Sequence, residues 1–228
     1  MRVEGIIFDK DGTLFDFHAT WAGWTKRFLT DFAEGDQAHA TRLAALIGYD
    51  YGRGTFRPDS VVIAGTNEDL ARALAAGLTA DEAAELATAI NRATSTAEMA
   101  EAVPLVPLLR GLRGRGLALG LATNDAESSA RGHLATAGID RFFDFVGGFD
   151  SGHGGKPAPG MLLAAARHMG LDPGRMAMVG DSTHDLVAGR AAGMIPVAVL
   201  TGIAGHDELA PHAEVVLPDI GHLPDWLG

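Results

Sequence analysis

The sequence contains no cysteine among its 228 residues. It therefore has no disulfide, no thiolate nucleophile and no thiolate metal site. The absence of disulfides is typical of a reducing compartment, and we expect a cytoplasmic protein. The sequence also lacks any apolar run near the roughly 20 residues that a membrane-spanning helix needs. No basic and then apolar leader opens the chain, so we expect neither a cleaved signal nor attachment to a membrane.

Positive charge is also scarce, because 18 lysines and arginines face 29 aspartates and glutamates, and the net charge is -11. An acidic surface argues against non-specific binding to nucleic acids or to anionic membranes. It is compatible with a small anionic substrate, since a local site can invert the overall sign. The 9 histidines form no HExxH or comparable pair, so we expect no zinc site.

The start of the chain and its second half predict a parallel α/β sheet. Strand-like apolar segments alternate there with helical segments, a pattern typical of parallel strands covered by helices on both faces. The expected strands are 3–8, 117–123, 143–148, 176–181, 195–200 and 213–217. The expected helices between them are 126–137, 159–169 and 184–192.

Between the first strand and the rest of the sheet, the pattern is helical. Residues 48–60 contain glycine, proline and aspartate without a clear period, which predicts a loop among these helices. We therefore expect one α/β core domain, residues 1–16 and 101–228, interrupted by an all-helical domain of residues 17–100. Segments rich in Ala, Leu, Glu and Arg predict the helices of this insert at 19–33, 38–47, 67–76 and 80–99.

Polar residues follow four of the expected strands, at the sheet edge where ligands bind in open α/β folds. Acids gathered at one edge repel each other unless a cation lies among them. Carboxylate oxygens suit a hard divalent ion, and Mg²⁺ prefers one or two carboxylates with waters and a substrate phosphate. The four segments are Asp9-Lys10-Asp11-Gly12-Thr13, Thr123-Asn124-Asp125, the loop with Lys156, and Gly180-Asp181-Ser182-Thr183-His184-Asp185.

Each segment alone has a structural explanation. Asp-Gly pairs are common in turns, Thr123 and Asn124 could cap a helix, and Lys156 could be a solvated surface lysine. Turns and caps do not explain why the four occur together, in order and at successive strand ends. The sequence therefore favours a site that binds a cation and an anion side by side.

The same four segments resemble the motifs of a known superfamily. DKDGTLFD (9–16), ATN (122–124), KPAP (156–159) and GDSTHDLVAGRAAGM (180–194) look like motifs one to four of the haloacid dehalogenase (HAD) superfamily. The helical insert after the first motif resembles the C1-type cap of that superfamily. Within it, the chain looks most like phosphoglycolate-phosphatase-like hydrolases. The resemblance implies a Rossmann-like core with an inserted helical cap, and an enzyme that hydrolyses phosphoric monoesters.

The resemblance also implies roles for the acids. Asp9 would be the nucleophile and form an aspartyl-phosphate, and Asp11 would act as general acid and then as general base. Mg²⁺ would be held by Asp9, the backbone carbonyl of Asp11, and Asp181. Asp185 would orient Lys156 or a metal-bound water, or would itself be a ligand, and the sequence does not decide between these roles.

A second set of groups is implied to hold the phosphate. Thr123 would donate a hydrogen bond to a phosphate oxygen, assisted by the backbone N–H groups of Gly12 and Asn124. Lys156 would balance the charge of the transferring group. These contacts supply the electrostatic help that a slow phosphate monoester hydrolysis needs.

Strand alternation gives a separate expectation for Lys10. Residues two apart in an extended strand point to the same side. Asp9 and Asp11 are therefore expected to face the substrate together, while Lys10 points elsewhere. We interpret Lys10 as a structural or surface residue without a part in the chemistry.

The helical insert offers candidates for substrate selection. The loop 48–60 is the best of them, because C1 caps resemble helical bundles with a substrate loop between their helices. Arg53 and Arg57 in this loop could bind a second anion, such as a carboxylate, in bidentate fashion. The alternative is that both are exposed loop arginines.

Three functions stay open at this point. The first is a Mg²⁺-dependent phosphatase for a small phosphorylated metabolite, with 2-phosphoglycolate as one candidate. The second is a sugar phosphomutase of the same superfamily, and the third is a non-catalytic module that binds a phosphate ligand.

A dehalogenase is disfavoured, because such enzymes lack an acid two positions after the nucleophile and Asp11 is present. A P-loop at Lys156 is excluded by Asp150 and Pro157. We expect a monomer or a homodimer.

Overall fold

The computed structural model describes residues 3–57, 60–64, 67–76, 78–95 and 97–228. The chain divides into two compact units. The first, called the core unit, comprises Met1–Phe17 and Met99–Gly228, and the second, called the helical unit, comprises His18–Glu98. Within the described ranges, no helix has the length and apolar character needed to cross a bilayer.

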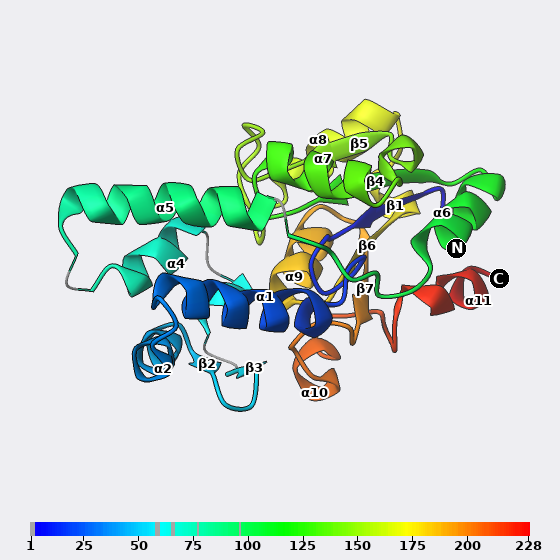
Figure 1. Ribbon diagram of the computed structural model, residues 1–228. Helices are drawn as coiled ribbons and strands as arrows, with labels where there is room; N and C mark the ends of the chain where they lie inside the picture. Colours follow the sequence, from blue (N-terminus) through cyan, green and yellow to red (C-terminus); the bar gives the residue numbers. More distant parts are fainter. Residues whose placement is uncertain (1–2, 58–59, 65–66, 77, 96) are drawn as a thin grey trace. The chain divides into compact units, whose positions relative to one another are not determined.

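The core unit is built on a parallel sheet of six strands in the order β5-β4-β1-β6-β7-β8 (Figure 1). All six predicted strands are present, and the predicted parallel α/β architecture is confirmed. The strands are β1 (Gly5–Phe8), β4 (Ala118–Ala122), β5 (Phe145–Gly147), β6 (Met176–Gly180), β7 (Ile195–Val199) and β8 (Val215–Leu217).

Register explains why the polar segments meet at one edge. Phe8, the last residue of β1, pairs with Leu121 of β4 and with Val179 of β6. The residues that follow these strands therefore leave the sheet at nearly the same level. This edge carries the carboxyl ends of the parallel strands, where ligands bind in open α/β sheets.

The central strand β1 is buried on both faces. Ile6 and Phe8 join a hydrophobic cluster with α6, α7 and α11, whereas Ile7 joins a second cluster with α8 and α9. Alternation along the strand sends neighbouring side chains to opposite faces, so a strand covered on both faces reads as a continuous apolar run. The helices are α6 (Leu105–Gly114), α7 (Glu127–Thr136), α8 (Gly160–Met169), α9 (Thr183–Ala191), α10 (His206–Leu209) and α11 (Leu223–Leu227), with 3-10 turns at Asp140–Phe142, Pro173–Arg175 and Ile220–His222.

The helical unit packs around aromatic residues of its first helix. The rings of Trp21 and Trp24 are 5.6 Å apart, and those of Trp24 and Phe28 are 5.1 Å apart. Both tryptophans are buried. Aromatic residues three or four positions apart share one face of a helix, so this spacing forms core packing. The helices are α1 (Phe17–Phe32), α2 (Gln37–Leu46), α3 (Val61–Ala64), α4 (Asn67–Leu74) and α5 (Ala80–Ser95).

The prediction of an irregular loop at 48–60 is wrong in part. The structure has a short antiparallel hairpin there, in which β2 (Tyr49–Asp50) pairs with β3 (Thr55–Phe56). Gly54 has a φ of 71°, which allows the chain to reverse, and the rings of Tyr49 and Phe56 pack 4.9 Å apart. Strands of two residues are too short to show a period in the sequence. Residues 58 and 59 of the predicted loop lie outside the described residues.

Candidate active site

The turn after β1 presents the first acid of the site. Asp9 is the first residue after the strand, and its backbone N–H still donates to the carbonyl of Val179 at 2.9 Å. Gly12 then adopts a φ of 75°, and its N–H donates to the carbonyl of Phe15 at 2.7 Å. A Cβ at Gly12 would lie only 2.3 Å from Oδ2 of Asp181. The turn therefore needs glycine for its backbone conformation and for the close approach of Asp181.

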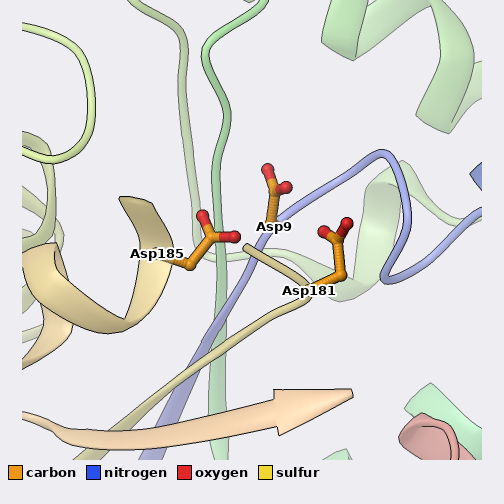
Figure 2. A group of neighbouring side chains, drawn as sticks. All are labelled: Asp9, Asp181 and Asp185. Atoms are coloured by element: carbon orange, nitrogen blue, oxygen red, sulfur yellow. The ribbon is translucent and has the colours of Figure 1, made fainter. Parts of the chain in front are cut away.

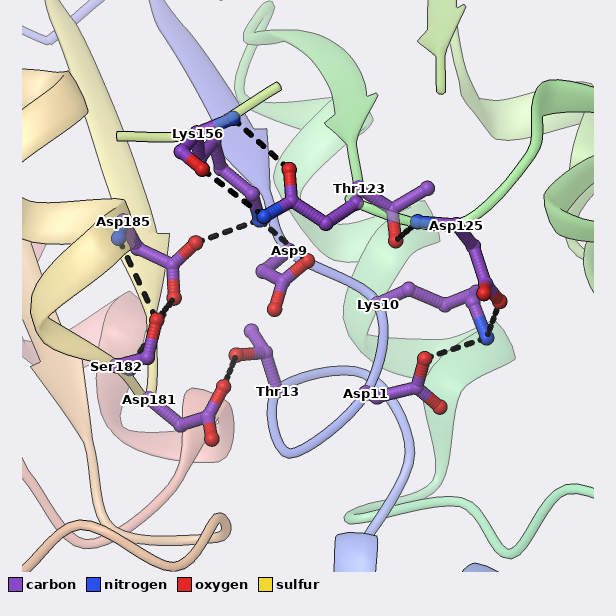
Figure 3. A network of polar contacts seen from close by, with 11 residues as sticks. Asp9, Lys10, Asp11, Thr13, Thr123, Asp125, Lys156, Asp181, Ser182 and Asp185 are labelled. Atoms are coloured by element: carbon purple, nitrogen blue, oxygen red, sulfur yellow. Dashed lines mark hydrogen bonds and ion pairs between the residues drawn. The ribbon is translucent and has the colours of Figure 1, made fainter. Parts of the chain in front are cut away.

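Lys156 connects two of the acids (Figure 3). Its Nζ lies 2.6 Å from Oδ1 of Asp9 and 2.5 Å from Oδ1 of Asp185. Burial alone would lower the pKa of Lys156, but the two carboxylates outweigh burial and raise its pKa above the usual value. Lys156 is therefore a fixed cation at the base of the site, and the surface interpretation of this residue is wrong.

Three carboxylates gather at this edge of the sheet (Figure 2). Asp9, Asp181 and Asp185 each place an oxygen within 4.8 Å of the others. Burial raises the pKa of Asp9 to about 7, with Asp185 adding to the rise and Lys156 opposing it. Burial and the charges of Asp185 and Asp9 also raise the pKa of Asp181 well above its usual value. One lysine thus leaves excess negative charge, and a group of oxygen ligands fits a hard divalent cation.

Asp185 has partners for both of its oxygens. Oδ1 faces Lys156, and Oδ2 accepts hydrogen bonds from the backbone N–H of Ser182 at 3.1 Å and from its hydroxyl at 2.6 Å. Ser182 in turn caps the start of α9 by accepting from the N–H of Asp185. The structure therefore holds Asp185 against Lys156, and Asp9 and Asp181 are the better-placed carboxylates for a cation.

Thr123 and Asn124 follow β4 and lie beside these charges. The hydroxyl of Thr123 is buried and accepts a hydrogen bond from the N–H of Asp125 at 3.1 Å. The side-chain amide of Asn124 donates to the carbonyl of Lys156 at 3.0 Å and accepts from its N–H at 2.8 Å. Asn124 thus holds the peptide of Lys156 through both polar atoms of its amide group. The predicted contact of its backbone N–H with phosphate stays a prediction.

The positions of Lys10 and Asp11 differ from those that strand alternation predicts. Lys10 is fully buried, so its surface interpretation is wrong. Its Nζ lies 2.6 Å from Oδ2 of Asp11 and 3.0 Å from Oδ2 of Asp125 (Figure 3). It is also 3.2 Å from Nδ1 of His133. Because β1 ends at Phe8, Asp11 lies in the following turn, where alternation no longer applies. The Asp11 carboxylate is therefore beside Lys10.

The loop after β7 contributes two residues that sequence reasoning missed. The hydroxyl of Thr201 donates to the carbonyl of Gly12 at 2.6 Å. A Cβ at Gly202 would lie 1.7 Å from Oδ2 of Asp181, so only glycine leaves room for that carboxylate. Both residues follow a strand of the sheet, and the strand-end rule that identified the other segments could have found them.

The structure brings together every predicted site residue of the core unit. Arg53 and Arg57 belong to the helical unit, and their part in a site with the core residues stays a prediction. Arg53 is exposed, with its Nε 3.8 Å from Oδ2 of Asp50. The residues assembled in the core unit are Asp9, Asp11, Gly12, Thr123, Asn124, Lys156, Asp181 and Asp185.

A cavity of about 890 Å³ lies elsewhere in the core unit, at the amino-terminal ends of the strands. Its lining includes Arg115, Arg190 and Glu214, and both arginines already donate to backbone carbonyls. Open parallel sheets bind ligands at the opposite edge, where the buried charges described above lie. Converging charged groups, rather than cavity size, therefore identify the candidate active site.

Two relatives match almost the whole chain. The protein named "Probable phosphatase IndB" of Dickeya dadantii is 31% identical over 223 residues, which cover 94% of this chain and 88% of that protein. A phosphoglycolate phosphatase of Rhodospirillum rubrum is 34% identical over 238 residues, which cover 99% of this chain and 91% of that protein. Both carry the word phosphatase in their names.

Two solved structures share the fold, and a family model matches most of the chain. A predicted phosphoglycolate phosphatase from Haemophilus somnus has a TM-score of 0.76 at 20% identity, covering 100% of this chain and 99% of that one. A beta-phosphoglucomutase from Clostridium difficile has a TM-score of 0.66 at 18% identity, covering 97% and 93%. These two similarities show the fold. The family model of haloacid dehalogenase-like hydrolases matches residues 3–193. With this match and two relatives aligned over nearly its full length, the chain belongs to the haloacid dehalogenase-like hydrolases.

Proposed function

We propose that this hydrolase is a Mg²⁺-dependent phosphatase that cleaves a small phosphorylated metabolite through an aspartyl-phosphate on Asp9. One observation carries the proposal: the buried Nζ of Lys156 bridges Asp9 and Asp185 while Asp181 lies beside them. In this arrangement the carboxylate of Asp9 would be the nucleophile, with a fixed cation and further anionic oxygens beside it. The phosphatase names of the two relatives support the same reaction class.

The reaction has two steps on Asp9 and Asp11. In the first, a carboxylate oxygen of Asp9 bonds to phosphorus, the bond from phosphorus to the substrate oxygen breaks, and Asp11 gives that oxygen its proton. In the second, Asp11 takes a proton from water as the water oxygen bonds to phosphorus. The bond to Asp9 then breaks, which releases phosphate and restores both carboxyl groups.

The oxygen atoms of this site are of the kind that binds Mg²⁺. Asp9 and Asp181 offer buried carboxylate oxygens, and burial together with the neighbouring carboxylates raises the pKa of both groups. With the backbone carbonyl of Asp11, they would hold the ion, which prefers a few carboxylates with waters and phosphate. When bound, Mg²⁺ offsets the repulsion between an anionic nucleophile and an anionic phosphate. We assign Asp185 the role of orienting Lys156, because both of its oxygens already have partners.

Four groups of the core unit would hold the transferring phosphoryl group. The hydroxyl of Thr123 would donate to one oxygen, and the backbone N–H groups of Gly12 and Asn124 would donate to others. Lys156 would balance the charge as it shifts onto the phosphoryl oxygens. The double hydrogen bond between Asn124 and the Lys156 peptide supports this role, because it fixes the backbone that carries the ammonium group.

The inserted helices, residues 17–100, would act as a cap that limits the access of water to the intermediate. Arg53 and Arg57 would bind an anionic group of the substrate distant from the phosphate. A substrate such as 2-phosphoglycolate has a carboxylate of this kind, and the relative from Rhodospirillum rubrum is named for that substrate. We therefore place 2-phosphoglycolate first among the candidates.

Phosphate release across a panel of phosphorylated metabolites tests the proposal. The panel includes 2-phosphoglycolate and sugar phosphates, each assayed with Mg²⁺ and with a chelator. We expect phosphate release that needs Mg²⁺ and is lost in Asp9→Asn, while the exposed control Asp207→Asn keeps activity. Full activity in Asp9→Asn would contradict the proposal. Conversion of one sugar phosphate into another without release of phosphate would instead identify a phosphomutase.

A further inference from the structure

We propose that Lys10 is a positioning residue that holds the carboxylate of Asp11 in place for proton transfer. This inference rests on the proposed function, because it concerns the acid–base step of that reaction. The residue has no other assigned role, although its side chain is fully buried and its ammonium group is within 2.6 Å of Asp11 Oδ2.

The partners of Lys10 come from three different segments. Asp11 belongs to the turn after β1, Asp125 to the loop after β4, and His133 to α7. Because a lysine ammonium only donates, Nδ1 of His133 accepts from it. The ammonium thus has three acceptors, at 2.6, 3.0 and 3.2 Å. These contacts offset the cost of burying a charge and fix where Nζ lies.

A fixed Nζ in turn restrains the Asp11 side chain. Asp11 lies beyond the end of β1, in a turn where its backbone forms an isolated bridge with Phe15, and its carboxylate points to Lys10. Its carboxylate is 24% exposed, whereas the side chain of Lys10 is 0% exposed. The buried ammonium is therefore the anchor, and the partly exposed carboxylate is the group being held. Proton transfer depends steeply on such orientation, and small displacements cost large factors in rate.

The second carboxylate that contacts Lys10, that of Asp125, belongs to a well-held segment. Asp125 is itself fixed, because its N–H donates to the hydroxyl of Thr123 at 3.1 Å and its carbonyl accepts from the N–H of Phe149 at 3.0 Å. Lys10 therefore links Asp11 to a rigid part of the β4 loop. Lys156 is bonded to Asp9 in a similar way, so Asp9 and Asp11 each contact a buried lysine.

The dependence of rate on the leaving group tests this role. An alkyl phosphate leaves as an alkoxide and needs protonation, whereas p-nitrophenyl phosphate leaves as a stabilised anion and needs little. The quantity to measure is kcat/KM, which covers the steps up to the aspartyl-phosphate. For Lys10→Met, we expect the ratio of kcat/KM for the best alkyl phosphate to that for p-nitrophenyl phosphate to fall at least about tenfold. A purely structural role would lower both values together and leave the ratio unchanged, which would overturn the inference.

The control is Lys26→Met, the same substitution at a lysine of the helical unit, and its ratio should match the wild type. If Lys10→Met does not fold, Asp125→Ala tests the same cluster, because it removes one acceptor of Nζ but keeps the Lys10–Asp11 pair. We expect it to lower the ratio about threefold, and an unchanged ratio would overturn the inference. A wild-type protein that hydrolyses neither ester would overturn the proposed function itself, an outcome distinct from an unchanged ratio.

Discussion

Lys156 and Asp9 form a buried ion pair across 147 positions of sequence, with 2.6 Å between Nζ and Oδ1. The pair joins the loop before α8 to the end of β1, and Asp185 accepts from the same ammonium. Asp181 lies beside these two acids, so three carboxylates gather near the end of β1. The proposed Mg²⁺ would bind among these carboxylates, and removing it should change activity and stability measurably.

The space around Asp181 gives the first prediction. Gly202→Ala would place a Cβ 1.7 Å from Oδ2 of Asp181, so the carboxylate must move. We expect the Mg²⁺ concentration for half-maximal activity to rise at least about tenfold. Gly205→Ala in the same loop is the matched control, because its Cβ meets nothing within 4 Å and its φ is -84°. Equal Mg²⁺ dependence in the two variants would contradict the assignment of Asp181 as a ligand.

The stability of the metal-free protein should depend on pH in an unusual direction. Burial raises the pKa of Asp9 from 3.8 to about 7, so between these values the folded state binds more protons than the unfolded state. Stability is then greatest at the acid end of this window and falls as pH rises toward 7. In a chelator, we expect the free energy of unfolding to fall by about 2–3 kcal/mol from about pH 5 to about pH 8.

Urea unfolding at each pH measures this fall. In Asp9→Asn, the fall should be smaller, because one buried acid no longer ionises, whereas Asp207→Asn should match the wild type. Mg²⁺ should reverse the fall, because a ligand that binds only the folded state stabilises it. A wild-type stability in chelator that rises from about pH 5 to about pH 8 would contradict the raised pKa of Asp9.

Asn124 should matter through the peptide that it holds. Asn124→Ala removes both hydrogen bonds to the Lys156 backbone and leaves the ammonium less well placed. We expect kcat to fall about tenfold or more with little change in melting temperature. Asn91→Ala is the control, because it removes an exposed hydrogen bond in the helical unit. A kcat equal to that of the control would show that the pairing of Asn124 with Lys156 is dispensable.

The two hairpin arginines should act on one class of substrate. If Arg53 and Arg57 bind a substrate carboxylate, replacing either with Ala should raise KM for 2-phosphoglycolate about tenfold. KM for p-nitrophenyl phosphate, which has no carboxylate, should stay the same. Arg42→Ala on α2 is the control, since this arginine is exposed in the same unit. Unchanged KM values for both esters would show that the two arginines are exposed residues that do not bind the substrate.

Much of the core could be predicted from the sequence, because parallel strands buried on both faces are continuous apolar runs. The run before Asp9 is one example, and fully buried Ile6 and Ile7 in β1 confirm it. The location of the candidate site could be predicted too, because the carboxyl ends of parallel strands lie at one edge of the sheet. The comparisons confirm the superfamily resemblance that the four motifs suggested.

Contacts of single side chains were beyond the reach of such patterns. Lys10 lies after the strand, and its long side chain turns into the interior, where acids distant in sequence receive it. No local pattern indicates that direction. The position of Gly202 after β7 could have placed it near the site, but only the position of Asp181 shows why this residue lacks a side chain. The β2–β3 hairpin was missed because two-residue strands are held by their turn and by the contact of Tyr49 with Phe56.

Capture of the covalent intermediate tests the central claim most directly. The protein is mixed with excess substrate and Mg²⁺, quenched in acid during turnover, digested, and examined by mass spectrometry. The account predicts the added mass of one phosphoryl group on the peptide that contains Asp9, and none on that peptide in Asp9→Asn. Sustained phosphate release by the wild type with no phosphoryl group on Asp9, or with the group on another residue, would contradict it.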